Sequence, residues 1–484
     1  MTSASAGWRF DNSYARLPAP LFSRLAPAPV RQPHLVVLND ALAAALGLDP
    51  AALGESPEVF AGNALPPGAE PLAQAYAGHQ YGHFVNLGDG RAILLGEQIG
   101  PDGRRHDIQL KGSGRTPYSR QGDGRAALGP MLREYVIGEA MHGLGIPTTR
   151  ALAVVATGEP VYRETVLPGA VLTRVAASHV RVGTFQFAAA LGDEALVGTL
   201  LDHCITRHDP ELAAAPERAL VFLDAVVGRQ ADLVARWLAV GFVHGVMNTD
   251  NCAVSGETID YGPCAFLDVY DPATVFSSID HHGRYAFGNQ PAITQWNLAR
   301  LAESLLGLFG DGGAGAVDAA RGVLATFPDR FRQRWLAAMR AKLGLFTAEE
   351  GDGQLADGLL AALAEARADY TQSWAALADR LAAGSPPAAT EALHVWEEAW
   401  RARLARQPQS LAEAAGLLRR SNPQVIPRNH LVEEALAAAV AGDLAPLERL
   451  VAAIRQPFVA TPENARYRQP PPAGGACYRT FCGT

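Results

Sequence analysis

One stretch decides the fold: His244-Gly-Val-Met-Asn-Thr-Asp-Asn251, followed shortly by Asp260-Tyr-Gly262. It follows an apolar segment that predicts a long buried helix over Ala219 to Val240, and it has itself the composition of a loop. Short strands are expected around Cys252–Val254 and Phe266–Val269. Asparagine and carboxylate oxygens a short loop apart are hard ligands of the kind that Mg²⁺ uses when it bridges phosphate oxygens. The stretch therefore predicts a metal and phosphate site, with a pair of structural Asx turns as the alternative.

Upstream, from residue 88 to about residue 175, short β-type segments are separated by glycine and proline. These segments are Ala92–Leu95, His106–Lys111, Leu152–Val155 and Ala170–Val175. One helix, over Met131 to Met141, interrupts them, and helical periodicity dominates from about residue 184 onward. The order predicts an α+β fold in which a small β-rich lobe precedes a larger helical lobe. Such a bilobed arrangement suits a ligand held between the lobes.

The chain is expected to have four parts. Residues 1–70 are rich in proline and are predicted to wrap a core built elsewhere. Residues 71–180 form the β-rich N-lobe, and residues 181–345 form the helical C-lobe with the metal loop. Residues 346–484 form a helical extension that ends in a cysteine-containing tail.

Composition narrows the class of protein. The chain has 484 residues, of which 48% are hydrophobic, and a net charge of −8 from 41 basic and 49 acidic side chains. This balance argues against a nucleic-acid binder, which needs a basic excess. No apolar run approaches the ~18 residues that cross a bilayer, and the start lacks a secretory signal pattern. Five scattered cysteines fit a reducing compartment, so we expect a cytoplasmic protein without a membrane partner.

Lys111 is the first candidate cation. Strand alternation in Ile108–Lys111 puts Gln109 and Lys111 on one face, away from the two apolar residues. A lysine on a strand, followed by Gly112-Ser-Gly114, can reach phosphate oxygens when a carboxylate holds it, and Glu134 on the following helix is the natural partner. Taken alone, a solvated surface lysine is the more common outcome.

The spacing around His244 matches the catalytic loop of protein kinases. Those enzymes place an asparagine seven residues after the histidine of H-R-D-x-x-x-x-N, and Asn251 lies seven residues after His244. Asp260-Tyr-Gly262 corresponds to their metal-binding D-F-G. The aspartate that serves as their base is replaced by Val246, so Asp250 is the carboxylate left to accept a proton.

Positive charge is more abundant than a minimal kinase pocket needs. Arg91 follows Gly88-Asp-Gly90, and Arg174 and Arg181 flank Ser178-His179. Arginine forks bind phosphate oxygens in pairs, so these residues together with Lys111 suit a polyphosphate that is held at several points.

In these residues and their neighbours, the chain resembles the selenoprotein O family, the YdiU-type proteins. The motifs that carry the resemblance are long and run from about residue 70 to the C-terminus. They are Leu87-Gly-Asp-Gly-Arg91, Leu110-Lys-Gly-Ser-Gly-Arg-Thr-Pro-Tyr-Ser-Arg120, Gly122-Asp-Gly-Arg125, Gly145-Ile-Pro-Thr-Thr-Arg-Ala-Leu152, His244 to Asn251, Ile259-Asp-Tyr-Gly-Pro263, Asn289-Gln-Pro291, Asn422-Pro-Gln-Val-Ile-Pro-Arg-Asn429 and Thr480-Phe-Cys-Gly-Thr484.

The resemblance implies a kinase-like fold with a reversed ATP, and transfer of AMP to Ser, Thr or Tyr hydroxyls of proteins. Asp250 would be the proton acceptor, or would orient Asn251 instead. Asn251 and Asp260 would hold Mg²⁺ or Mn²⁺, and Glu134 would pair with Lys111. The residues implied to contact the nucleotide are Gly88, Gly90, Arg91, Lys111, Asp123, Gly124, Arg174, Arg181 and Asp260.

Several alternatives stay open at the level of sequence. UTP in place of ATP is one, since no residue identifies the base. A phosphotransferase that moves the γ-phosphate to a small molecule is another, although Val246 argues against it. A third is a non-catalytic nucleotide-binding pseudokinase with a redox-sensing tail. Cys477 and Cys482 near the end would form the redox pair of that tail, and two reduced thiols are the simpler expectation. Nothing in the sequence identifies the protein substrates or the oligomeric state.

Overall fold

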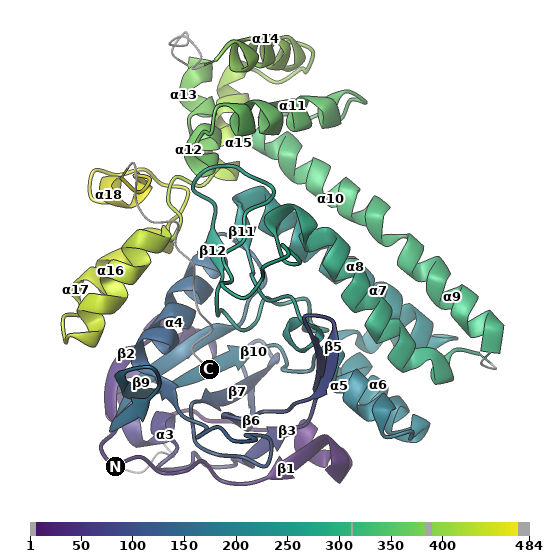
Figure 1. Ribbon diagram of the computed structural model, residues 1–484, viewed down its shortest axis with the longest axis vertical. Coiled ribbons are helices and arrows are strands. Elements are labelled where there is room, and N and C mark those ends of the chain that lie inside the picture. Colours follow the sequence, from purple (N-terminus) through teal and green to yellow (C-terminus); the bar gives the residue numbers. More distant parts are fainter. Residues whose placement is uncertain (1–5, 311–312, 383–389, 473–484) are drawn as a thin grey trace.

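The computed structural model describes residues 6–310, 313–382 and 390–472 (Figure 1). An eight-stranded antiparallel sheet forms the first lobe, in the order β1-β3-β6-β7-β10-β9-β2, with β8 paired to β10. Its strands are β1 (Phe22–Arg24), β2 (His34–Leu38), β3 (Leu72–Gln74), β6 (Ala92–Ile99), β7 (Arg105–Lys111), β8 (Ala126–Ala127), β9 (Arg150–Tyr162) and β10 (Val166–Ala176). The four central strands contain the four β-type segments expected from the sequence.

The two faces of the sheet are covered differently. Helix α4 (Leu128–Gly143) packs on the face of Leu172, while Ile108 and Leu110 point to the opposite face. That opposite face is covered by α1 (Asp40–Ala45), α2 (Pro50–Gly54) and α3 (Pro57–Ala61). In the register, Lys111 lies opposite Leu172 and Gln109 lies opposite Arg174. Lys111 and Arg174 therefore share the face that α4 covers.

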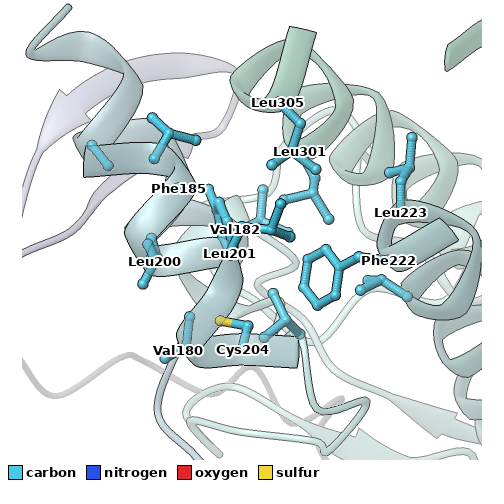
Figure 2. Packing of buried hydrophobic residues seen from close by; sticks show 14 of the residues in the cluster. Val180, Val182, Phe185, Leu200, Leu201, Cys204, Phe222, Leu223, Leu301 and Leu305 are labelled. Carbon is cyan, nitrogen blue, oxygen red and sulfur yellow. The ribbon is translucent and has the colours of Figure 1, made fainter. Parts of the chain in front are cut away.

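The helical lobe is built on a core between four helices (Figure 2). Phe185 of α5 packs on Phe222 of α7, with 5.8 Å between ring centroids, and Leu200 and Leu301 close the cluster from α6 and α8. Burying each of these side chains contributes roughly 1.5–3 kcal/mol. The helices of this lobe are α5 (Val182–Ala190), α6 (Glu194–His208), α7 (Arg218–Val240), α8 (Gln290–Leu305), α9 (Gly313–Ala325) and α10 (Phe327–Lys342).

The loop of interest lies between two paired two-residue strands. Gly241, with φ of +77°, ends α7, and β11 (Phe242–Val243) then pairs antiparallel with β12 (Ala265–Phe266). The strand expected around Cys252–Val254 is reduced to a single bridge between Ala253 and Arg181. The reason is local, because a 3₁₀ turn ends directly before these residues and the next turn already begins at Val254.

The last part of the chain makes two separate packing units. Helices α11 (Asp352–Glu365), α12 (Tyr370–Ala375), α13 (Leu377–Ala382), α14 (Glu391–Leu404) and α15 (Leu411–Ser421) extend the helical lobe around Trp374 and Trp400. The chain then returns to the first lobe, where α16 (Asn429–Val440) and α17 (Ala445–Ile454) pack against α4 (Figure 1). The short helix α18 (Ala465–Arg468) follows.

The predicted α+β class with a bilobed, kinase-like arrangement is confirmed. Across the described ranges, no helix combines the length and the apolar character needed to span a membrane.

Candidate active site

A cleft of about 730 Å³ lies between the sheet, α4 and the loop after β11. Every described residue that the sequence analysis singled out for the nucleotide or the metal lines it. These residues are Gly88, Gly90, Arg91, Lys111, Asp123, Gly124, Glu134, Arg174, Arg181, Asp250, Asn251 and Asp260. The structure therefore brings together side chains that are separated by up to about 170 residues of sequence. Cys477 and Cys482 lie outside the described residues.

Three cations lie together in the cleft and share two carboxylates. Lys111 Nζ donates to Glu134 Oε2 and to Asp260 Oδ1, each at 2.7 Å. Arg174 Nε donates to Glu134 Oε1 at 2.6 Å, and its Nη2 donates to Asp260 Oδ1 at 2.5 Å. Arg181 Nη1 lies 3.5 Å from Asp260 Oδ2. Burial opposes the ionisation of Asp260, but the three cations hold its pKa well below its usual range.

Arg181 is fixed from several sides. Its backbone bridges Ala253, and its Nη1 donates to the carbonyl oxygen of Asp250 at 3.0 Å. Its guanidinium lies 4.4 Å from the ring centroid of Tyr76, within cation–π range. Asp89 lies between Gly88 and Gly90, and its Oδ1 is 3.9 Å from Arg181 Nη2. Burial raises the pKa of the Asp89 carboxyl to about 6. Arg181 is thus held in the cleft, with its carboxylate contacts to Asp260 and Asp89 at 3.5 and 3.9 Å.

His244 supports the loop rather than lining the cleft. It is buried, and its Nε2 donates to the carbonyl oxygen of Ile259 at 2.9 Å, directly before Asp260. Its backbone N–H donates to Gln290 Oε1 at 3.0 Å. Burial lowers the pKa of His244, so the neutral ring ties the two halves of the loop together.

Asp250 presents a carboxylate that the protein leaves partly unsatisfied. It sits in the 3₁₀ turn Thr249–Asn251, and its Oδ1 is buried without a hydrogen-bond partner among the described residues. Burial raises its pKa to about 6. Gly78 of β4 (Ala77–Gln80) lies against it, since a Cβ at Gly78 would be 2.2 Å from Asp250 Oδ1. β4 pairs with β5 (His83–Asn86), and this hairpin covers the loop through a bond from the His79 N–H to Thr249 Oγ1.

Asn251 and Asp260 offer oxygen ligands for a cation. Asn251 Nδ2 donates to the carbonyl oxygen of Val246 at 2.9 Å, so the carboxamide oxygen is the atom that can ligate an ion. Asp260 has φ of +62°, a conformation that is uncommon outside glycine and that gathers at functional sites. Within the described ranges no group of three or more His, Cys, Asp or Glu side chains is arranged to hold a metal. Two hard oxygen ligands supplemented by phosphate oxygens and water fit Mg²⁺ or Mn²⁺.

Two glycine turns form the rim near the sheet. Gly88 has φ of +129°, and a Cβ there would be 2.4 Å from Tyr118 Cγ. Gly124 has φ of +69°, and a Cβ there would be 2.1 Å from the carbonyl oxygen of Gly114. The carbonyl oxygen of Arg91 accepts from the Gly112 N–H at 2.7 Å, which holds the first turn beside Lys111. Both turns require glycine at these positions.

Asp123 has a partner that sequence reasoning missed. Arg163, at the end of the β9–β10 hairpin, donates to its two carboxylate oxygens at 2.8 and 3.0 Å and lowers its pKa. No spacing rule connects the two residues, and only the hairpin brings them together. Tyr76, Gly78 and Tyr118 were missed for the same reason. A further wall of the cleft comes from α16, through Glu433, Leu436, Ala437 and Val440.

The fold and the cleft define a class of protein: a kinase-like enzyme that acts on a nucleotide. The family model described as "Protein adenylyltransferase SelO" matches residues 6–455, and the chain belongs to this family. It is 59% identical over 482 residues to the "Protein nucleotidyltransferase YdiU" of Brevibacillus brevis, covering 99% of this chain and 98% of that one. Proteins of the same name from Geobacillus kaustophilus and Syntrophotalea carbinolica are 57% and 56% identical, covering 99% and 100% of this chain and 100% and 99% of theirs.

Proposed function

We propose that this protein transfers AMP from ATP to Ser, Thr or Tyr hydroxyls of protein substrates and releases pyrophosphate. The observation that carries the proposal is the cluster of Lys111, Arg174 and Arg181 beside Asp260, in a cleft where Val246 stands in place of the kinase base. A reversed triphosphate needs such a cradle for its β- and γ-phosphates, because its α-phosphorus faces the acceptor. Family membership and the names of the relatives support the same activity.

In the proposed reaction the hydroxyl oxygen of the acceptor attacks the α-phosphorus. The bond from that phosphorus to the oxygen bridging to the β-phosphate breaks, and its electron pair leaves with pyrophosphate. Lys111, Arg174 and Arg181 stabilise the charge that develops on this leaving group, the largest contribution in reactions of this type. Asn251 and Asp260 would hold Mg²⁺ or Mn²⁺, which neutralises phosphate oxygens when bound.

Asp250 is proposed to take the proton of the hydroxyl. Its buried Oδ1 has no partner in the described part of the chain, and a pKa of about 6 leaves the carboxylate ionised at neutral pH yet able to accept a proton. A loose transition state needs little help from a base, so orienting Asn251 is the alternative role.

All three cations contact Asp260 in the structure. A triphosphate competes for them, and each cation that turns to a phosphate oxygen releases one contact to this carboxylate. Asp260 would then have an oxygen available to hold a metal. The ion pairs hold the three cations in position and leave fewer unpaired charges in the cleft.

ATP labelled at the α or the γ position tests the proposal. We expect a protein acceptor, or the enzyme itself, to retain label from the α position, with the mass of one AMP on a hydroxyl side chain. Retention of γ label alone would establish a phosphotransferase instead. If Asp260→Ala changed no measurable activity of the pure protein, the pseudokinase reading would stand. Labelled UTP run in parallel decides between the two nucleotides.

We also propose a cytoplasmic location, which the buried free thiols of Cys204, Cys252 and Cys264 support.

A further inference from the structure

Arg133, the residue before Glu134 on α4, also lines the cleft, at the wall formed by α16, and makes an unusual set of contacts there. Its Nη1 donates to Glu433 Oε1 at 2.8 Å. Its Nη2 donates to Asn429 Oδ1 and to the carbonyl oxygen of Cys264, each at 2.7 Å. One guanidinium therefore joins α4 to α16 and to the segment that follows Asp260-Tyr-Gly262.

Arg133 and Glu134 are adjacent on α4, so a movement of this helix displaces both side chains. We call this pair of residues the lever. Successive residues of an α-helix point about 100° apart, so neighbours reach different surroundings. Glu134 faces the sheet, where it holds Lys111 and Arg174. Arg133 faces α16, and a shift of α4 that breaks one set of contacts displaces the other.

The two bonds from Nη2 are buried and the ion pair with Glu433 is partly buried, which separates these contacts from an ordinary surface ion pair. The Arg133 side chain is 8% exposed and that of Glu433 is 35% exposed. Charge-assisted bonds from both ends of a guanidinium fork fix direction as well as distance. Their geometry is set by two fixed partners, since the Cys264 carbonyl belongs to the paired strand region and Asn429 begins α16.

Helix α16 is itself anchored firmly. Arg428, directly before it, has a fully buried side chain that pairs with Asp268 at 2.5 Å and with Asp369 at 2.6 Å. Along the helix, Val432 and Leu436 pack in the same core as Leu132 of α4. Helix α16 is thus a fixed support for α4 that is attached to the helical lobe.

We propose that Arg133 is a positioning residue: it holds α4 so that Glu134 keeps Lys111 and Arg174 aimed into the cleft, with α16 as the fixed support. The C-terminal part of the chain is then a component of the nucleotide site. This inference rests on the proposed function for the nature of its ligand, a nucleoside triphosphate. The location of the lever rests on the contacts alone.

The test is a double-mutant cycle in the full-length protein, read by the dissociation constant for ATP with Mg²⁺ in titration calorimetry. Arg133→Met should weaken ATP binding about 10-fold in the parent, on the scale of coupling between residues in one network. In an E134Q background the same change should have an effect of less than about twofold, because the lever then has no carboxylate to position. Equal effects in the two backgrounds would overturn the proposal.

Two further variants keep the test decisive if Arg133→Met folds poorly. R133K retains one cationic donor and should recover part of the affinity, since an ammonium cannot serve all three acceptors in the geometry of a fork. E433A removes a half-exposed partner and should weaken ATP binding about twofold to threefold, again only when Glu134 is present. Full activity of E433A together with unchanged affinity in R133K would contradict the lever.

Amide exchange supplies a readout that needs no nucleotide. In R133M, hydrogen exchange should speed up across α4 and stay unchanged in α5. Arg403→Met is the matched control, because that side chain is 3% exposed and ion-paired but lies away from the cleft. It should lower stability and leave both ATP affinity and exchange in α4 unchanged. If the wild type bound no ATP, the proposed function would fail, while unaltered exchange in α4 of R133M would separately refute the lever.

Discussion

Arginines are buried to the same degree in the cleft and in the C-terminal helices and share carboxylates in both places, yet those of the cleft line a large cavity and Arg403 does not. Arg403 donates Nε to Asp352 Oδ1 at 2.7 Å and Nη2 to the carbonyl oxygen of Thr347 at 2.8 Å, and it also contacts Glu349. In the cleft, Lys111 and Arg174 share the carboxylates of Glu134 and Asp260 between them.

This difference distinguishes charged residues that stabilise the fold from charged residues that are placed to bind a ligand. Arg403 has two carboxylates and a carbonyl at hand, with no cavity beside it among those described. The cations of the cleft line about 730 Å³ of open space and include Arg181, whose nearest carboxylate oxygen is 3.5 Å away. Because these cations lie beside the cavity, phosphate oxygens that enter it can replace the Asp260 carboxylate as their partner.

The sharpest way to break the comparison is Asp260→Asn. This change removes a charge from the centre of the cation cluster and weakens a ligand of the expected metal. We expect AMP transfer to fall by at least about 10³-fold, the scale seen when a preorganised charge is lost from a transferring phosphoryl group. Initial rates with α-labelled ATP measure it. A variant that keeps a tenth of the parent rate would show that Asp260 has another role.

Arg403→Met should break the other side of the comparison. Removing Arg403 leaves the buried Asp352 carboxylate with Arg340, at 2.7 Å, as its remaining cation, and the lost bonds cost about 1–3 kcal/mol. Denaturant unfolding followed by tryptophan fluorescence is sensitive to this region, because four of the seven tryptophans, Trp335, Trp374, Trp396 and Trp400, lie in its hydrophobic core. The transition of these helices should move to lower denaturant while ATP affinity stays the same. A change in ATP affinity would mean that the two regions are coupled.

Gly78→Ala tests how closely the cleft is packed around its reacting groups. The new Cβ would lie 2.2 Å from Asp250 Oδ1, so the carboxylate or β4 must move. We expect kcat to fall roughly 10–100-fold with a smaller change in ATP affinity, since displacement of about 1 Å has effects of this size. Gly322→Ala in α9 is the control, because nothing lies within 4 Å of its added Cβ. Equal rates for the two variants would show that Asp250 tolerates displacement.

The smallest effect is expected at Lys342. This residue shows what burial does to the pKa of a cation that has no carboxylate partner in the described part of the chain. Its ammonium lies 4.6 Å from the Trp374 ring centroid, and burial lowers its pKa from 10.5 to about 7. The unfolded chain therefore binds more protons between about pH 7 and 10.5, and the free energy of unfolding rises with pH across that window.

Lys342→Met should abolish this rise and raise the unfolding free energy at pH 7 by roughly 1–2 kcal/mol. Denaturant titrations of parent and variant at pH 7 and pH 10 measure both effects. If the free energy of unfolding of the parent fell between pH 7 and pH 10 by as much as that of the variant, this would contradict the lowered pKa of Lys342.

Local patterns were enough to predict most elements. The strands expected at Ala92–Leu95 and His106–Lys111 lie within β6 and β7, and the helix expected over Met131 to Met141 lies within α4. Alternation and helical periodicity are properties of neighbouring residues, so they survive in the folded state. The strand expected around Cys252–Val254 was wrong as a strand, because only one bridge, from Ala253 to Arg181, forms there.

The amino-acid sequence by itself determined which chemistry is present: the spacing from His244 to Asn251 and Asp260, the glycine turns, and a lysine on the polar face of its strand. Only the tertiary structure decided which residues from distant parts of the sequence contact one another. Gly78 touches Asp250, Arg163 pairs with Asp123, and α16 returns to hold Arg133 across roughly 300 residues. Spacing encodes only contacts within a turn or a strand, whereas these pairs arise from how separate elements bury their apolar faces, which no local pattern specifies.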